Sequence, residues 1–324
     1  MRIPTVIRRR PITAGVALAV LLTAGVLQFV GVNPAASQSA TLTAFESSTD
    51  PGTDPASPAW KKAPVLQAPL SFQGATYPTG GGSIPTVSAQ ALHFQDRLYI
   101  RLQWDDATKD DTTTKVENFS DAAAIEFPAV SAATVPSICM GQASSGVNIW
   151  QWRADSQAGL KDPADVYTNA LVDMYPSKDA IFYTARAAGN PYADPNQGPT
   201  QTLVAQAFGT LAKANVQDVK GDGVYADGKW AVVFERQLTG GDVDQATFTN
   251  GKSTDMAFAV WNGSEGDRNG KKSVSQFLKL SLVGVSLAGE ESNPAGWIAA
   301  AALLVGFVGL GVGLGWYGYR ESKR

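Results

Sequence analysis

The sequence contains a single cysteine, Cys139, and a single histidine, His93, among its 324 residues. One cysteine excludes an internal disulfide, and it also excludes paired-cysteine zinc sites and the CxxCH attachment of haem. One histidine excludes multi-histidine metal sites and leaves His93 as the sole candidate for Ser-His-Asp or Cys-His catalysis. Because His93 lies in an apolar run on an expected strand, we interpret it as a structural residue.

The sequence also has no large excess of charge of either sign, since 26 Lys and Arg residues nearly balance 29 Asp and Glu residues and the formal net charge is -3. The sequence has no basic stripe interleaved with aromatic residues, which excludes nucleic acid as a partner on electrostatic grounds. It also lacks paired carboxylates at a recognisable spacing and a nucleophile elbow. A free-standing enzyme is therefore the weakest of the functional classes considered.

The N-terminal segment has the layout of an export signal. Arginines at positions 2, 8, 9 and 10 precede an uncharged run from Pro11 to Ala36. Small residues at Ala35 and Ser37 offer a cleavage site. The apolar run also reaches the roughly 20 residues that cross a bilayer. We therefore expect residues 1–37 to be a signal peptide or an N-terminal anchor.

The C-terminal segment is typical of a transmembrane helix. No charged residue occurs from Trp297 to Tyr319, and basic residues follow within 320–324. The positive-inside rule places this tail in the cytoplasm. We expect a single span over 295–319, a cytoplasmic tail at 320–324, and a main domain on the extracytoplasmic side of the cell membrane.

Between these segments the composition changes twice. Residues 38–58 are rich in Ser, Thr, Asp and Pro, a composition that favours a flexible linker. Residues 59–290 contain short β-type runs separated by turn residues, which predicts an all-β domain, a single β-sandwich, with long loops over 186–226. The strands are expected at 87–94, 98–104, 122–127, 147–152, 181–185, 229–235, 255–261 and 276–282.

Eight segments of the central domain resemble, in order and spacing, one known family. They are AWKKAPV at 59–65, LYIRLQWDD at 98–106, FSDAAAIEFP at 119–128, CMG at 139–141, VNIWQW at 147–152, DGKWAVVFER at 227–236, AFAVWNG at 257–263 and GKKSVS at 270–275. The family comprises the haem-binding γ-subunits of type II molybdenum enzymes of the DMSO reductase family, such as those of ethylbenzene dehydrogenase and dimethylsulfide dehydrogenase.

The resemblance implies a β-sandwich that holds one haem b between a methionine and a lysine. The methionine corresponds to Met140, and the lysine to Lys272 or Lys271, with Lys272 preferred because it directly precedes Ser273. It further implies a non-catalytic electron-transfer subunit. Its partners would be an iron-sulfur subunit, a molybdopterin catalytic subunit, and a cytochrome c or a membrane electron carrier.

Judged from the residues alone, these positions have simpler interpretations. Met140 would fill a gap in the core, although the following Gly141 would let a flat ligand approach the backbone. The polar, turn-prone segment 266–273 predicts solvated lysines. Within it, Asp267 and Arg268 could pair with a haem propionate or with a partner subunit.

Two other classes remain open at this point. The chain could be a haemless extracytoplasmic module that binds carbohydrate through exposed aromatic rings, or an interaction module that uses its β-faces for assembly. Most aromatic residues are expected in the core, and one or two are expected against a porphyrin.

Overall fold

The computed structural model describes residues 40–286 except 75–76, 130–134, 137–139, 143–144, 160–186 and 188–197. The predicted N-terminal signal or anchor, the C-terminal span with its basic tail, and the expected strand at 181–185 lie outside the described residues. Among the described residues, no helix is long and apolar enough to cross a membrane.

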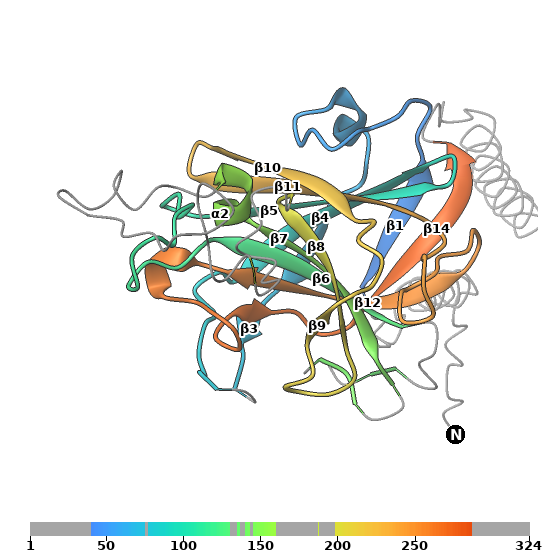
Figure 1. Cartoon of the computed structure of the whole chain (residues 1–324). Helices are drawn as coiled ribbons and strands as arrows, with labels where there is room; N and C mark the ends of the chain where they lie inside the picture. Colours follow the sequence, from blue (N-terminus) through green and yellow to red (C-terminus); the bar gives the residue numbers. More distant parts are fainter. Residues whose placement is uncertain are drawn as a thin grey trace, which may run out of the picture. The chain divides into compact units, whose positions relative to one another are not determined.

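The described chain is nearly all β, as expected, with only short helical turns (Figure 1). Its strands are β1 (Thr41–Glu46), β2 (Leu66–Pro69), β3 (Ser71–Phe72), β4 (Thr86–Phe94), β5 (Arg97–Asp105), β6 (Ala122–Pro128), β7 (Val147–Arg153), β8 (Thr200–Ala205), β9 (Ala212–Lys213), β10 (Lys220–Ala226), β11 (Lys229–Gln237), β12 (Ser253–Trp261), β13 (Ser273–Val274) and β14 (Leu278–Ser286). The helical turns are η1 (Pro58–Lys61), α2 (Ala154–Ala158) and η3 (Gly263–Glu265).

Hydrogen bonds join the strands in one path, β10-β11-β5-β4-β1-β14-β12-β6-β7-β8-β9. The path turns a corner at β12. Residues 253–256 of this strand pair with β14, whereas residues 257–261 pair with β6. A strand that changes sheets in this way is how layered β-structures form their corners. We call β10, β11, β5, β4, β1 and β14 the first layer, and β6, β7, β8 and β9 the second layer. β12 contributes one half to each layer.

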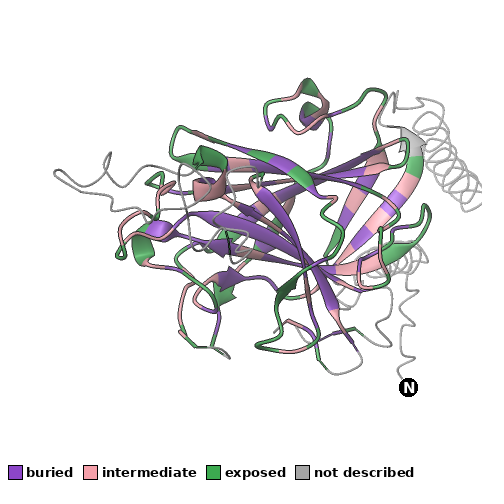
Figure 2. Ribbon diagram, viewed as in Figure 1, coloured by how far each residue is buried: buried purple, intermediate pink, exposed green. Residues whose placement is uncertain are grey.

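One hydrophobic core lies between the two layers. It takes alternate residues from β4, β5 and β11 on one side, and from β6, β7 and β12 on the other. Trp104, Trp152 and Trp230 meet within it, with ring centroids 4.9–6.5 Å apart. Figure 2 shows the buried residues concentrated along the strands and the exposed ones in the turns. This is the layered arrangement of a β-sandwich, and seven predicted strands match β4, β5, β6, β7, β11, β12 and β14.

The prediction of a flexible linker over 38–58 is wrong for residues 41–46, which form β1. This strand lies between β14 and β4 and runs parallel to both. Leu42 and Ala44 point into the core, because apolar and polar residues alternate along Thr41–Glu46. The long loops predicted over 186–226 are likewise wrong where β8, β9 and β10 form.

Candidate functional site

A cavity of about 470 Å³ lies on the outer face of the second layer, away from the core. It is lined by residues of β6, β7, β8 and β12, by the loop that follows β12, and by Met140. The volume falls in the range of roughly 300–1,000 Å³ that is usual for ligand and cofactor sites. The cavity is therefore the candidate functional site of the described chain.

Small apolar side chains form the floor of this cavity. Ala122 and Ala124 on β6 lie beside Ala257 and Ala259 on β12, and all four line the cavity. They share one face because alternate residues of a strand point to the same side. Alanines leave depth above the strands where larger side chains would fill it. This part of the cavity is therefore apolar and leaves room for a ligand above the strands.

Met140 lines this cavity and packs against the apolar cluster of the outer face. Its φ is 72°, a left-handed conformation that few residues other than glycine adopt. The next residue, Gly141, also has a positive φ, and a Cβ there would come within 2.9 Å of the Ser145 carbonyl oxygen. Strained backbone of this kind is concentrated at functional sites. The turn therefore defines the backbone position from which Met140 lines the cavity.

Lys272 lines the same cavity, so the structure brings together the two residues that the resemblance singled out. Its ammonium nitrogen lies 4.8 Å from the ring centroid of Trp261 on β12. The backbone of Lys272 packs against Gly81, and the amide of Gly82 donates to Ser273 Oγ at 3.0 Å. The lysine is thus fixed through its backbone from the 80–82 turn.

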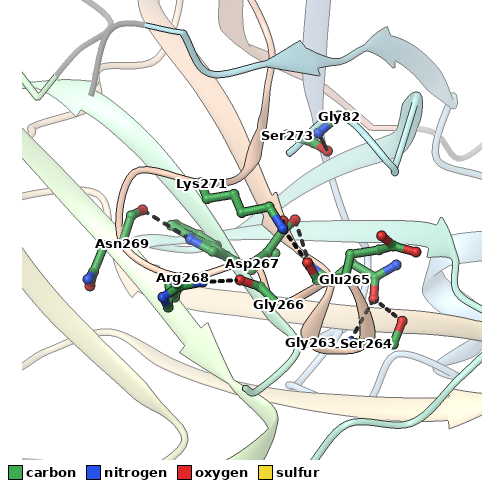
Figure 3. A network of polar contacts seen from close by, with 12 residues as sticks. Gly82, Gly263, Ser264, Glu265, Gly266, Asp267, Arg268, Asn269, Lys271 and Ser273 are labelled. Atoms are coloured by element: carbon green, nitrogen blue, oxygen red, sulfur yellow. Dashed lines mark hydrogen bonds and ion pairs between the residues drawn. The ribbon is translucent and has the colours of Figure 1, made fainter. Parts of the chain in front are cut away.

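Lys271 takes a different direction from its neighbour. Its Nζ donates to the carbonyl of Glu265 and lies 3.7 Å from Asp267 Oδ1 (Figure 3). Lys271 does not line the cavity among the described residues. The two lysines that the sequence left as alternatives therefore have different surroundings, and Lys272 is the one that faces the cavity.

The loop that carries both lysines is closed by its own hydrogen bonds. Asn262 Oδ1 accepts from the amide of Ser264 at 3.1 Å, and the backbones of Arg268 and Lys271 pair with each other. The indole of Trp261 donates to the carbonyl of Asn269 at 3.2 Å. The sequence predicted a solvated turn here, and Arg268 and Asn269 are indeed exposed, but both also line the cavity.

Asp267 and Arg268 both line the cavity. Asp267 is buried, and its Oδ2 accepts from the amide of Asn262 at 3.2 Å. Burial raises the pKa of this carboxyl, while the charge of Lys271 acts in the opposite direction. The guanidinium of Arg268 lies 4.8 Å from the ring centroid of Phe119. A cation and a carboxyl are therefore available at the edge of the apolar floor.

Glu126 is a site residue that the sequence reasoning missed. It lines the cavity from β6, and its Oε1 is buried without a hydrogen-bond partner. Burial raises its pKa to about 8, although the charge of Lys272 lowers it. Gln151 on β7 also has a buried, unpartnered Oε1 in this lining. The one feature of the sequence that could have indicated Glu126 is that it is a carboxylate within the otherwise apolar run of β6.

The other candidate residues lie elsewhere. His93 is buried in β4 and donates from Nε2 to the carbonyl of Val283 at 2.9 Å, which fits the structural role predicted for it. Met256 is buried in the core, and Cys139 is outside the described residues. Trp150 lies in the core, as expected for most of the aromatic residues, whereas Trp261 lines the cavity.

The chemistry of this lining is that of a thioether and an amine above an apolar floor. Methionine sulfur and neutral nitrogen bases are ligands that proteins offer to haem iron. The donor set, the volume and the small alanine side chains are therefore compatible with an iron porphyrin.

Comparison with curated proteins identifies relatives that are named as subunits of reductases or of a dehydrogenase. The Haloferax mediterranei protein named "Putative respiratory nitrate reductase heme subunit ORF7" is 30% identical over 258 residues, which cover 79% of this chain and 78% of that protein. Chlorate reductase subunit gamma of Ideonella dechloratans is 29% identical over 230 residues, covering 69% and 78%. Dimethylsulfide dehydrogenase subunit gamma of Rhodovulum sulfidophilum is 27% identical over 234 residues, covering 68% and 72%.

Solved structures give only distant matches. A family 9 carbohydrate-binding module of Caldicellulosiruptor kristjanssonii in complex with cellotriose has a TM-score of 0.39 and 8% identity, covering 76% of this chain and 95% of that one. The complex of such a module with glucose has a TM-score of 0.40 and 10% identity, covering 75% and 97%. These matches are too remote to bear on the ligand.

The family described as ethylbenzene dehydrogenase matches residues 57–273, which include both lysines and every residue that lines the cavity except Val274. This match and the three relatives agree with the resemblance found in the sequence motifs. The chain therefore belongs to the ethylbenzene dehydrogenase family, as a gamma subunit of the type II molybdenum enzymes of the DMSO reductase family.

Proposed function

We propose that this chain is an electron-transfer subunit that binds one haem b in the cavity on the second layer, with Met140 and Lys272 as the axial ligands of the iron. The observation that carries the proposal is that these two residues, far apart in the sequence, line one cavity of suitable size. Membership of a family of gamma subunits supports it. The word "heme" in the name of the Haloferax relative supports it further.

Lys272 must be neutral to bind iron. An ordinary lysine has a pKa of roughly 10.4, so loss of its proton at pH 7 costs about 4–5 kcal/mol. In the absence of iron, the face of the Trp261 ring favours the charged amine, and the carboxyl of Glu126 does so once it ionises above its pKa of about 8. Coordination has to offset these contributions. Haem binding is therefore expected to release a proton and to become tighter as the pH rises.

Met140 and Lys272 together would leave iron without an open coordination position. Bound haem supplies one-electron redox chemistry, and a site with two protein ligands favours electron transfer over substrate activation. The alanine floor keeps water from one face of the ligand. Arg268, at the edge of the cavity, is placed to pair with a propionate.

The proposal extends to the complex in which the chain works. An iron-sulfur subunit next to a molybdopterin catalytic subunit would exchange electrons with the haem, and a cytochrome c or a membrane carrier would connect it to the respiratory chain. The charge-free run at 297–319 and the basic tail would tether the complex to the membrane with the main domain outside the cytoplasm.

The test compares single variants of the full chain, purified from a host that supplies haem. Met140→Ala and Lys272→Ala are expected to lose haem or to shift the low-spin absorption spectrum, because each removes one axial ligand. Lys271→Ala is the matched control, since its amine is engaged with Glu265 and Asp267, and it should retain the wild-type spectrum. Circular dichroism establishes that each variant is folded.

Wild-type spectra in both ligand variants would contradict the ligand assignment. If purified wild-type protein lacked haem altogether, the proposal of a haem-binding subunit would be replaced by one of the haemless alternatives, a carbohydrate-binding module or an interaction module.

A further inference from the structure

Three aspartates form a compact acidic group at the edge of the sandwich. One carboxylate oxygen from each of Asp106, Asp110 and Asp121 lies within 4.8 Å of the other two. Asp106 is 3% exposed and Asp121 is 0% exposed. Within the part of the chain that the structure describes, none of the three forms an ion pair with lysine, arginine or histidine. The group therefore concentrates negative charge without a protein cation.

One buried oxygen of this group has no partner. Asp106 Oδ1 accepts from the amide of Thr108 at 3.2 Å, whereas Oδ2 is buried and accepts no hydrogen bond. The indole of Trp104 acts on this carboxyl as a donor that lowers its pKa, although its Nε1 forms no hydrogen bond of regular geometry. A buried carboxylate oxygen left without a partner is costly, which points to a ligand that the protein itself does not supply.

Burial is the main influence on the acidity of two of these carboxyl groups. Burial, followed by the charge of Asp106 as a lesser cause, raises the pKa of Asp121 to about 7 despite three hydrogen-bond donors. Burial is also the main cause that raises the pKa of Asp106, and the charge of Asp110 adds to it.

We propose that Asp106, Asp110 and Asp121 bind one divalent cation of the calcium type. All of the clustered ligands are carboxylate oxygens, which hard cations prefer, and no histidine or cysteine is present to favour zinc or copper. Calcium accepts irregular geometry and completes its shell of 6–8 oxygens with water and carbonyl groups, whereas magnesium demands a regular octahedron.

The carboxylates are held in place before any cation arrives. Asp121 Oδ2 accepts from the amide of Asp110 at 2.7 Å and from the indole of Trp230 at 2.9 Å. Asp121 Oδ1 accepts from the amide of Gly263 at 2.8 Å. These contacts connect the end of β5, the start of β6 and the loop after β12, so a cation would brace three segments at once.

The site has a structural consequence for its surroundings. Asp121 directly precedes Ala122 of the cavity floor, and Gly263 opens the loop that carries Lys272. A cation at Asp121 would therefore stiffen one edge of the cavity. This inference does not depend on haem binding, and either can fail without the other.

The test uses the purified full chain after treatment with a calcium chelator and dialysis. Calcium is expected to raise the melting temperature in a saturable manner. Terbium, which substitutes for calcium, should give emission sensitised through Trp230, because its indole contacts Asp121, with saturation at one ion per chain. Calcium should displace the terbium.

Asp110→Asn is the variant of choice, because Asp110 is only half-buried and the fold should tolerate the change. It is expected to weaken terbium and calcium binding at least 10-fold. Asp111→Asn is the matched control, since Asp111 pairs with Lys109 outside the group, and it should bind as the wild type does. The proposal is overturned if wild-type protein shows neither response, or if Asp110→Asn and wild type respond alike.

Discussion

Replacing Gly81 with alanine should displace Lys272 without touching its side chain. Gly81 has a φ of +88°, and a Cβ at this position would lie 2.2 Å from the carbonyl oxygen of Lys272 and 2.3 Å from its carbonyl carbon. Ordinary van der Waals contact begins at 3.4 Å, so the two backbone segments must separate by about 1 Å. Metal–ligand distances tolerate deviations of only about 0.2 Å. The substitution therefore exceeds what axial ligation can absorb.

In Gly81→Ala, the cost of the left-handed backbone conformation has to be separated from the cost of the clash with Lys272. The left-handed conformation itself costs an alanine about 1–2 kcal/mol, wherever in the chain it occurs. Gly251→Ala isolates this cost, because Gly251 has a φ of +75° with no atom within 4 Å of the added Cβ. Gly80→Ala is a second control, since its Cβ would meet only the side chain of Lys271, at 3.5 Å.

The assay is the rate of haem transfer from the purified chain to an excess of apomyoglobin, followed together with the low-spin absorption spectrum. Gly81→Ala is expected to lose haem at least 10-fold faster than the wild type and to show a shifted spectrum. Gly251→Ala should retain the wild-type spectrum and rate. A folded Gly81→Ala protein with wild-type haem retention would refute the view that the 80–82 turn positions the ligand.

Three further substitutions test other parts of the structure. Glu126→Gln should stabilise the haem-free protein more at pH 8.5 than at pH 5 in urea titrations. In the wild type, the pKa of Glu126 in the folded state is about 8 and exceeds the ordinary value of about 4.3, so the folded state loses stability as the pH rises between these values. An equal effect of the substitution at both pH values would contradict this. Leu42→Ala in β1 should cost about 2–5 kcal/mol, whereas Leu211→Ala, 46% exposed, should change stability by less than about 0.5 kcal/mol. Equal losses would mean that β1 is not a core strand. Arg236→Ala should cost about 3–5 kcal/mol in the same assay, because it empties a buried position and leaves the carbonyl of Ala246 without its donor, and a loss below about 1 kcal/mol would speak against this.

The strands that the sequence predicted are those whose side chains alternate or form a full apolar run. β5 and β11 are examples, and they lie next to each other in the first layer. β1 escaped prediction because the composition of 38–58, averaged over the segment, concealed the alternation in residues 41–46. Its place between β4 and β14 depends on contacts with residues far along the chain, which local composition does not report.

β10 escaped for a different reason, because its glycines were interpreted as loop signals. Gly221 and Gly223 are instead sites of close packing. A Cβ on Gly223 would lie 2.3 Å from the ring of Trp152, and one on Gly221 would lie 2.4 Å from the carbonyl oxygen of Val233. Glycine within a strand often marks such a close approach. Only the partner across the sheet distinguishes this use from a turn.

The site was predictable only in part. The resemblance to the gamma subunits singled out Met140 and Lys272, and the structure places both on one cavity. Local sequence pointed the other way for Lys272, because a polar turn predicts a solvated lysine. The packing of Gly81 on Lys272 and the buried carboxyl of Glu126 are contacts between distant segments. No local pattern contains them.

The measurement that tests the central claim most directly is the haem content of the full chain, purified with its complex and quantified by the pyridine haemochrome method against protein concentration. The account predicts one haem b per chain, reduced to well below one in the double variant Met140→Ala, Lys272→Ala. A wild-type chain that carries no iron porphyrin, or a double variant that keeps a full complement with an unchanged low-spin spectrum, would contradict it.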